Sequence, residues 1–115
     1  MAVLTVNVID RSGSLDPVAS LVAAAGGGDA FPNTGKEFVI FQNTGGTPVT
    51  VTEVMQTTVD GQTVASKTFS VPATTGYRVV GPYPTANYND ANARMNFTYS
   101  GVTGFKVGVF VTTTN

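Results

Sequence analysis

The sequence contains no cysteine, no histidine and no tryptophan. The first two absences exclude disulfide bonds, thiol nucleophiles, zinc sites built on cysteine or histidine, and every catalytic triad with an imidazole base. The third removes the largest of the planar aromatic side chains on which sugar-binding sites usually rest. The composition therefore excludes much of the common catalytic chemistry.

Charged residues are also scarce. Six lysines and arginines stand against seven aspartates and glutamates, which gives a formal net charge of −1. Only 11% of the residues are charged, against about 25% in typical soluble proteins. Such a chain lacks the basic surface that nucleic acids and anionic membranes attract, so we expect neither as a partner.

Long apolar runs are absent as well. No stretch approaches the ~20 apolar residues of a membrane-spanning helix. Residues 1–9 alternate between apolar and polar side chains and contain no basic residue, so they do not resemble a signal peptide. We therefore expect a protein that is made in the cytoplasm without export.

What the chain does contain is β-branched residues and turn residues. Its 115 residues are enough for one domain. Valine and threonine number 18 each, and 13 glycines and 6 prolines are spread among them. β-branched side chains suit a pleated sheet, and regularly spaced turns favour an all-β fold. The sequence predicts a single-domain two-sheet β-sandwich, Ig-like or jelly-roll-like, with a strand order that the pattern leaves open.

Alternating or continuous apolar patterns mark about seven or eight strands. They are expected near residues 3–9, 38–41, 49–59, 63–71, 77–80, 94–99 and 105–111. Asp60-Gly61 is a hairpin signal, and a shift in apolar phase predicts a bulge near Thr52-Glu53. The last two strands are predicted to pair as a hairpin with one buried face. The predicted core comprises Val6, Val8, Phe38, Ile40, Val51, Phe69, Val79, Phe97, Val107 and Val109.

Residues 10–36 form the least regular region and are predicted to be a long loop or arm. Leu15, Val18, Leu21 and Val22 have helical spacing, and Asp16-Pro17 can begin one helical turn near residues 17–22. The small residues 23–28 that follow are typical of a flexible connection. Two interpretations remain: a surface loop, or an arm that becomes ordered only against a partner.

The acidic residues do not form a catalytic or metal-binding pattern. Asp10, Asp16 and Asp29 lack the spacing of a calcium loop and are expected to be solvated loop carboxylates. Glu37 and Glu53 are the only glutamates, and nothing in their spacing favours a catalytic carboxylate pair. We therefore expect no enzyme activity, no cofactor and no metal.

The segment 83–90 directly follows Pro82, contains Pro84 and has clustered Asn and Asp residues. It is predicted to be a long ordered loop or a brief helical turn. Tyr83 and Tyr88 lie on it, and such rings could contact a sugar or a protein. The alternative is that both rings fold back over the end of the sandwich core.

Three stretches carry a resemblance to a known group. One is residues 31–46, in which the turn Pro32-Asn33-Thr34-Gly35 leads to an apolar strand and an Asn-rich turn. The others are 71–73 with 81–89, and the closing stretch that begins at Phe97. Together this pattern, which covers residues 31–111, resembles small β-rich virion proteins of tailed phages, among them the capsid decoration (cement) proteins.

This resemblance implies a structural protein that is made in the host cytoplasm and then binds the outside of the phage head. The implied partner is the major capsid protein, and the implied state is a homo-oligomer, with a trimer as one arrangement. The alternative is a carbohydrate- or host-surface-binding module of a fibre or tail adaptor. The residues that we expect to make the assembly contact are Leu15, Val18, Leu21, Val22, Tyr83 and Tyr88.

Overall fold

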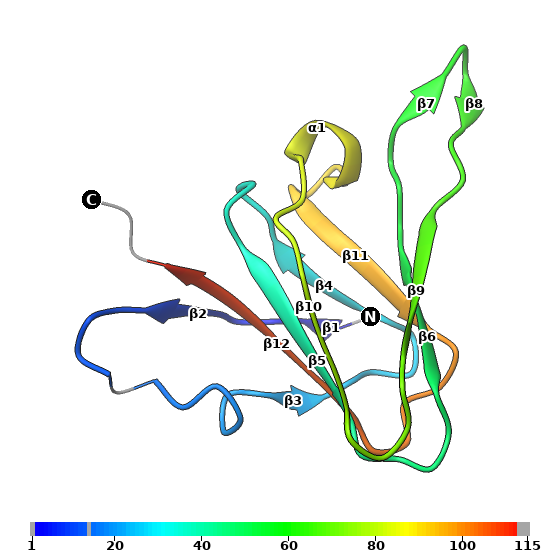
Figure 1. The fold of residues 1–115 in the computed structure, drawn as a ribbon. Helices are drawn as coiled ribbons and strands as arrows, with labels where there is room; N and C mark the ends of the chain where they lie inside the picture. Colours follow the sequence, from blue (N-terminus) through cyan, green and yellow to red (C-terminus); the bar gives the residue numbers. More distant parts are fainter. Residues whose placement is uncertain (1, 14, 113–115) are drawn as a thin grey trace.

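The computed structural model describes residues 2–13 and 15–112, which form two β-sheets packed face to face (Figure 1). In spatial order, the first sheet is β1 (Ala2–Val3), β4 (Asp29–Pro32), β11 (Arg94–Tyr99), β6 (Val49–Glu53) and β9 (Lys67–Val71). The second sheet is β10 (Gly76–Val80), β5 (Phe38–Asn43), β12 (Phe105–Thr112) and β2 (Val6–Ile9), and β3 (Val22–Ala23) also pairs with β12. The predicted all-β sandwich is thus confirmed.

The predicted first strand, residues 3–9, is divided between the two sheets. Its beginning, β1, pairs in parallel with β4, whereas β2 pairs in parallel with β12. Leu4 lies at the crossing, where its side chain is buried and its N–H donates a hydrogen bond to the Ala30 carbonyl at 2.7 Å. The N-terminal strand therefore joins both sheets along one side of the sandwich.

The predicted hairpin at Asp60-Gly61 is confirmed. Strands β7 (Thr58–Val59) and β8 (Gln62–Thr63) flank it, and φ is 51° at Asp60 and 76° at Gly61. Positive φ at both central residues is the geometry of a type I′ turn, which suits Asp-Gly. The flanking strands are shorter than expected: β6 ends at Glu53 and β9 begins at Lys67, so the predicted continuous strand is interrupted over residues 54–57. The hairpin consequently stands out from the sandwich (Figure 1).

The last two strands do not pair with each other as predicted. β11 pairs with β4 and β6 in the first sheet, and β12 pairs with β5, β2 and β3 in the second. Their apolar faces instead meet across the core. An alternating pattern is the same for a hairpin as for two strands that face each other from opposite sheets, so the pattern alone could not distinguish them.

The core lies between the two sheets around the ring of Phe41. That ring makes an edge-on contact with Phe97 at 5.2 Å and stacks on Phe105 at 5.5 Å between ring centroids. Such aromatic pairs add to the free energy gained from burial alone. Four of the predicted core residues, Val51, Phe97, Val107 and Val109, are fully buried, and Val6 and Phe69 pack partly buried against the cluster.

The remaining predicted core residues were assigned to the wrong face. Val39 and Phe41 point into the core, so Phe38 and Ile40 lie half-buried on the outer face of the second sheet. Val79 pairs with Ile40 and therefore shares this outer face, where it is 64% exposed. Val8, on an edge strand, is 53% exposed. Because four apolar residues follow one another in β5, period-two alternation could not show which face is buried.

The irregular N-terminal region is shorter than the predicted arm of residues 10–36. Residues 29–32 form β4, a strand between β1 and β11 in which Asp29, Ala30 and Phe31 are buried. The sequence pattern did not predict this strand, because it is only four residues long and ends at Pro32, where a turn begins. The segment after Pro82 behaves as predicted, with one helical turn, α1 (Thr85–Tyr88).

Candidate functional site

The predicted helical turn after Asp16 is present over residues 17–20. The Asp16 side chain accepts hydrogen bonds from the N–H groups of Val18 at 3.0 Å and Ala19 at 3.2 Å. The Ser20 N–H closes the turn by donating to the Asp16 carbonyl at 3.1 Å. Asp16 is thus an N-cap for a single turn, and the chain then continues into β3.

The four predicted contact residues of this segment divide into two pairs. Leu21 is buried and Leu15 is half-buried, whereas Val18 is 56% and Val22 is 50% exposed. Leu21 lies directly over Gly108 of β12, because a Cβ added to that glycine would come within 2.7 Å of the Leu21 Cδ2. The segment therefore packs on its own second sheet, and Val18 and Val22 are the residues of this set that present apolar surface.

A groove of about 240 Å³ separates this segment from the outer face of the second sheet. Leu15 and Pro17 line one side, and Phe38, Ile40 and Phe110 line the other. Phe38 and Phe110 stack with 5.9 Å between their ring centroids. The stacked rings thus form the floor of an apolar groove beside the segment.

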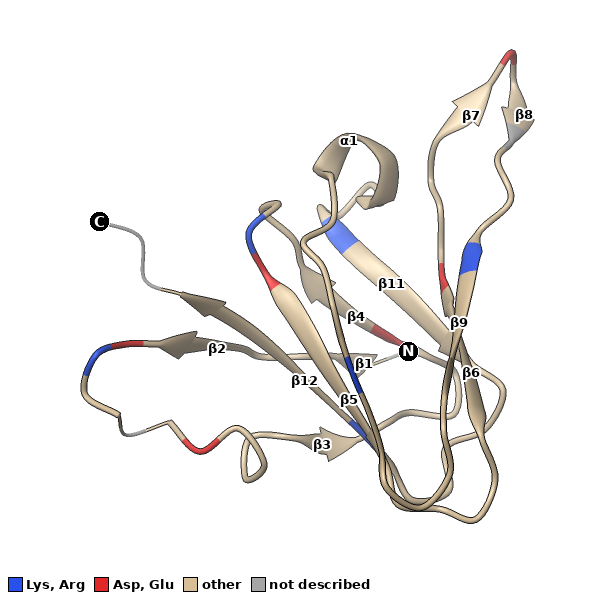
Figure 2. Cartoon of the chain, viewed as in Figure 1, with Lys and Arg blue, Asp and Glu red and all other residues tan. Residues whose placement is uncertain are grey.

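Exposed apolar side chains are concentrated in the N-terminal part of the chain. Among the described residues, the large exposed ones are Val3, Val8, Val18, Val22, Val59, Tyr77 and Val79. Four of these seven belong to residues 2–23, the part that extends to one side of the sandwich (Figure 1). This part carries only Asp10, Arg11 and Asp16 as charged residues, and charge is sparse elsewhere (Figure 2).

The two tyrosines of the 83–90 loop are buried. Tyr83 is 4% and Tyr88 is 6% exposed, their rings meet edge-on at 5.1 Å, and Tyr83 also contacts Phe97 at 5.8 Å. The rings thus close the end of the core, as in the second of the two interpretations, and do not form an exposed platform. Burial, together with the nearby Glu53 carboxylate, raises the pKa of Tyr83 far above its usual range.

The expectation of a solvated loop carboxylate was wrong for Asp29, which is fully buried. Its Oδ2 accepts hydrogen bonds from the Tyr99 hydroxyl at 2.8 Å and from the Ala25 N–H at 3.2 Å. Its Oδ1 has no hydrogen-bond partner among the described residues. The small-residue segment before Asp29 therefore forms a turn whose Ala25 N–H binds the carboxylate. Gly28 permits this turn because it adopts a φ of 98°, which favours glycine.

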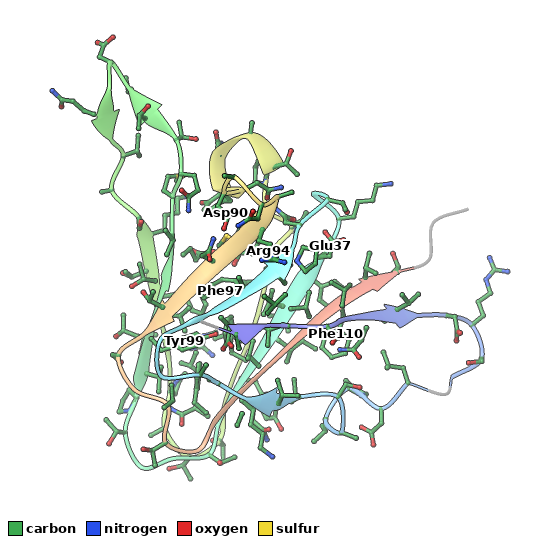
Figure 3. All side chains as sticks on the ribbon, turned by 180° about the vertical axis from the view of Figure 1, so that it is seen from behind. Glu37, Asp90, Arg94, Phe97, Tyr99 and Phe110 are labelled. Carbon is green, nitrogen blue, oxygen red and sulfur yellow. The ribbon has the colours of Figure 1, made fainter. Side chains whose placement is uncertain are left out.

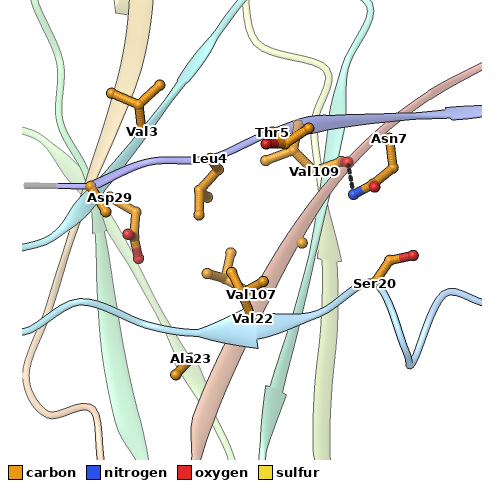
Figure 4. A pocket seen from close by; sticks show the side chains of 12 residues that line it. Val3, Leu4, Thr5, Asn7, Ser20, Val22, Ala23, Asp29, Val107 and Val109 are labelled. Carbon is orange, nitrogen blue, oxygen red and sulfur yellow. Dashed lines mark hydrogen bonds between the residues drawn. The ribbon is translucent and has the colours of Figure 1, made fainter.

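A pocket of about 280 Å³ lies beside this carboxylate, where β1 crosses to β2 opposite β3. Figure 4 shows the Asp29 side chain pointing into the space that Leu4, Val22 and Val107 surround. The full lining comprises Ala2, Val3, Leu4, Thr5, Asn7, Ser20, Val22, Ala23, Asp29, Val107, Gly108 and Val109. Asp29 is the only ionisable residue in this lining.

Two further carboxylates, those of Glu37 and Asp90, hold local turns. Glu37 accepts hydrogen bonds from the N–H of Thr34 at 2.7 Å and from its hydroxyl. Burial alone would raise the Glu37 pKa, but these bonds outweigh it and keep the pKa below its usual value. Asp90 accepts from the Asn96 side chain at 2.9 Å and from backbone N–H groups near Arg94, which lowers its pKa (Figure 3).

Among the described residues, no three acidic side chains gather in a way that could hold a metal ion. Sequence reasoning missed the Asp29–Tyr99 pair because its members are 70 residues apart. Asp29 follows three glycines, so it appeared to belong to a loop. The strand Ala30-Phe31 directly after it is the one local signal that could have placed it inside the sandwich.

No described helix is long and apolar enough to cross a membrane. No protein-family model matches the chain, and neither a curated protein nor a solved structure matches it. The resemblance to phage virion proteins therefore stays a prediction from the sequence, and the site must be judged on its own geometry.

Proposed function

We propose that this chain is a non-enzymatic structural protein of a tailed-phage virion that binds the outer surface of the head. Its partner in this proposal is the major capsid protein, and its role is to brace the shell. The resemblance of residues 31–111 to small virion proteins supports the choice of partner. The structure supports a binding role through one observation, the concentration of exposed apolar side chains in residues 2–23.

This N-terminal part suits a contact with another protein. Val3, Val8, Val18 and Val22 are each at least half exposed. Complete burial of a fully exposed valine contributes about 1.5–3 kcal/mol, and a side chain that is already half buried gains about half of that, so several of them together support a stable contact. The segment around Val18 is already held by Leu15 and Leu21 on its own sheet, which lowers the conformational entropy lost on binding.

The described carboxylates support a role without catalysis. Glu37 and Asp90 are engaged in local hydrogen bonds, and Asp29 is buried beneath the sandwich edge. The same apolar surface can also bring copies of the chain together, and we include a homo-oligomer, with a trimer as one form, in the proposal. A sugar-binding module is supported less well, because the rings of Tyr83 and Tyr88 are buried.

The test is binding of the purified protein to DNA-filled or expanded heads built from the major capsid protein encoded nearest to its gene. Occupancy is measured by electron cryomicroscopy and by co-sedimentation. Val18→Asp with Val22→Asp should reduce occupancy strongly, because each substitution places a charge in the contact.

The matched control is Val59→Asp. Val59 is 62% exposed but lies on the β7–β8 hairpin, away from the N-terminal segment (Figure 1). The control should bind heads as the natural chain does. Failure of the natural chain to bind any such heads would contradict the proposed function, and equal loss in the control would contradict the proposed surface.

A further inference from the structure

We infer that the pocket beside Asp29 binds a primary ammonium group carried on a short alkyl chain. This inference goes beyond the proposed function. Val3 and Val22 belong both to the proposed contact surface and to the pocket lining, but the test below uses the isolated chain, so either proposal can fail without the other. The inference rests on a fully buried carboxylate that keeps one oxygen without a hydrogen-bond partner among the described residues, next to a pocket.

Hydrogen bonds hold the Asp29 carboxylate in place, but no described donor to it carries a positive charge. Within residues 2–13 and 15–112, the donors that reach it are the Tyr99 hydroxyl and the Ala25 N–H, which both bind Oδ2 and are both uncharged. A buried carboxylate is stabilised by charged partners or by several hydrogen bonds, and an oxygen left without a partner lacks part of that stabilisation. Burial, followed by the nearby Asp29 carboxylate, raises the pKa of Tyr99 above its usual range, so Tyr99 keeps its proton and remains a hydrogen-bond donor to Oδ2. A cationic hydrogen-bond donor is therefore expected to bind most favourably at Oδ1, the oxygen without a described partner.

The rest of the lining selects the shape of the ligand. Leu4, Val107 and Val109 form an apolar wall, and Thr5 and Ser20 supply hydroxyl groups. Among these lining residues there is no second charge that could hold a carboxylate or a phosphate. An alkylammonium ion fits both the carboxylate and the apolar wall. Its ammonium group can bind Oδ1, and its chain of a few carbons can displace water from the apolar wall.

Entry is possible at the sandwich edge. The pocket lies between two strands of only two residues each, β1 and β3, and the exposed side chains of Val3 and Val22 stand in its lining. Short edge strands open more readily than the central strands of a sheet. Because Asp29 itself is fully buried, we expect the ammonium to reach Oδ1 only after a small displacement of this edge.

The test uses n-butylammonium as the probe and follows backbone amide signals of the uniformly ¹⁵N-labelled protein by NMR. The Ala25 amide is the reporter, because its N–H donates to the Asp29 carboxylate. n-Butylammonium should produce a saturable shift of this signal. n-Butanol, which has the same chain without the charge, should bind about tenfold or more weakly, as expected when a charged hydrogen bond is lost. Tetramethylammonium, which carries the charge but no donor, should also bind weakly.

Two variants complete the experiment. Asp29→Asn removes the charge at nearly constant size and should abolish the preference for n-butylammonium over n-butanol. Ser20→Leu adds bulk to the lining without touching Asp29, and it should weaken both probes. If Asp29→Asn does not fold, Ser20→Leu and the n-butanol comparison still decide. Equal binding of the two probes, undiminished binding in either variant, or no saturable shift at all would overturn the inference.

The same chemistry can come from a free amine or from a lysine side chain of another protein. An acetyl-Gly-Lys-Gly-amide peptide, compared with its norleucine counterpart, separates the two sources. Binding of n-butylammonium alone assigns the pocket to small free amines. Binding of the lysine peptide as well assigns it to an extended lysine side chain.

Discussion

The Tyr99 hydroxyl donates a 2.8 Å hydrogen bond to the Asp29 carboxylate and so connects two strands of the first sheet through their side chains. The ring of Tyr99 contacts the ring of Phe105 edge-on at 5.2 Å. Phe105 belongs to β12 of the second sheet, so the Tyr99 ring packs in the core between the two sheets. Asp29 in turn holds the Ala25 N–H of the preceding turn. This one pair therefore fixes β4, the turn before it and the aromatic core relative to one another.

We expect Tyr99→Phe to lower the free energy of unfolding by about 1.5–3 kcal/mol, because it removes a hydrogen bond to a charged group and keeps the ring. Urea denaturation at neutral pH measures this. The matched control is Tyr77→Phe, which removes a hydroxyl that accepts a hydrogen bond from Gln42 on the exposed surface. Its effect should stay within about 0.5 kcal/mol. Equal effects of the two variants would show that the bond to Asp29 adds no stability.

Alkaline pH should destabilise the fold through the buried tyrosines. The pKa values of Tyr83 and Tyr99 are raised in the folded chain, mainly by burial, whereas an unfolded tyrosine titrates near pH 10. Above that pH the unfolded state releases protons that the folded state retains, so stability is complete below about pH 10 and falls above it. Urea midpoints at about pH 8 and about pH 11 measure the change. The double variant Tyr83→Phe/Tyr99→Phe should show a smaller difference between the two, and an undiminished difference would contradict the assignment.

Phe97→Ala should cost about 3–5 kcal/mol, because this fully buried ring contacts Phe41, Phe31 and Tyr83. Val79→Ala is the control. Sequence pattern placed both residues in the core, but Val79 is 64% exposed and its truncation should cost less than about 0.5 kcal/mol. Chemical denaturation of both variants gives the comparison. A loss below about 1 kcal/mol for Phe97→Ala would remove this ring from the core.

The contrast between these two residues shows how far the sequence could predict the fold. Alternation in β11 and β12 identified Phe97, Val107 and Val109 as core residues, because each of these strands has one clearly apolar face. In β5 both faces are apolar, and only pairing with β12 determines that Phe41 points inward. Which strands share a sheet depends on contacts between distant residues, and an alternating pattern does not contain them.

The candidate site was predictable only in part. The helical spacing after Asp16 correctly predicted one turn, because the N-cap and its proline act locally. Leu21 is buried because it packs over Gly108 of β12, whereas the neighbouring Val22 is half exposed. Gly108 is distant in the sequence, so the local pattern could not show which of the two side chains is buried. The role of Asp29 was missed for the same reason, since its partner Tyr99 comes from the other end of the chain.

Gly76 should not tolerate a larger side chain. A Cβ at this position would lie 1.9 Å from the Pro72 carbonyl oxygen, so backbone must move. We expect Gly76→Ala to destabilise the fold by about 1–3 kcal/mol, the usual cost of forcing atoms into a packed site. Gly46→Ala is the control, because a Cβ there would meet no atom within 4 Å. Thermal unfolding of both variants checks this, and a neutral Gly76→Ala would mean that the turn has room to relax.

The parallel pairing of β2 with β12 has a mechanical consequence. Val6–Ile9 runs alongside Val109–Thr112 in the same direction, and the two strands lead away to the opposite ends of the chain. Tension applied to both ends therefore pulls these neighbours past each other along their length. The hydrogen bonds of a parallel ladder are evenly spaced across this direction, so they carry the load together and do not open one after another. Pulled in this way, the sandwich resists extension by shear, a property that would suit the bracing role proposed above.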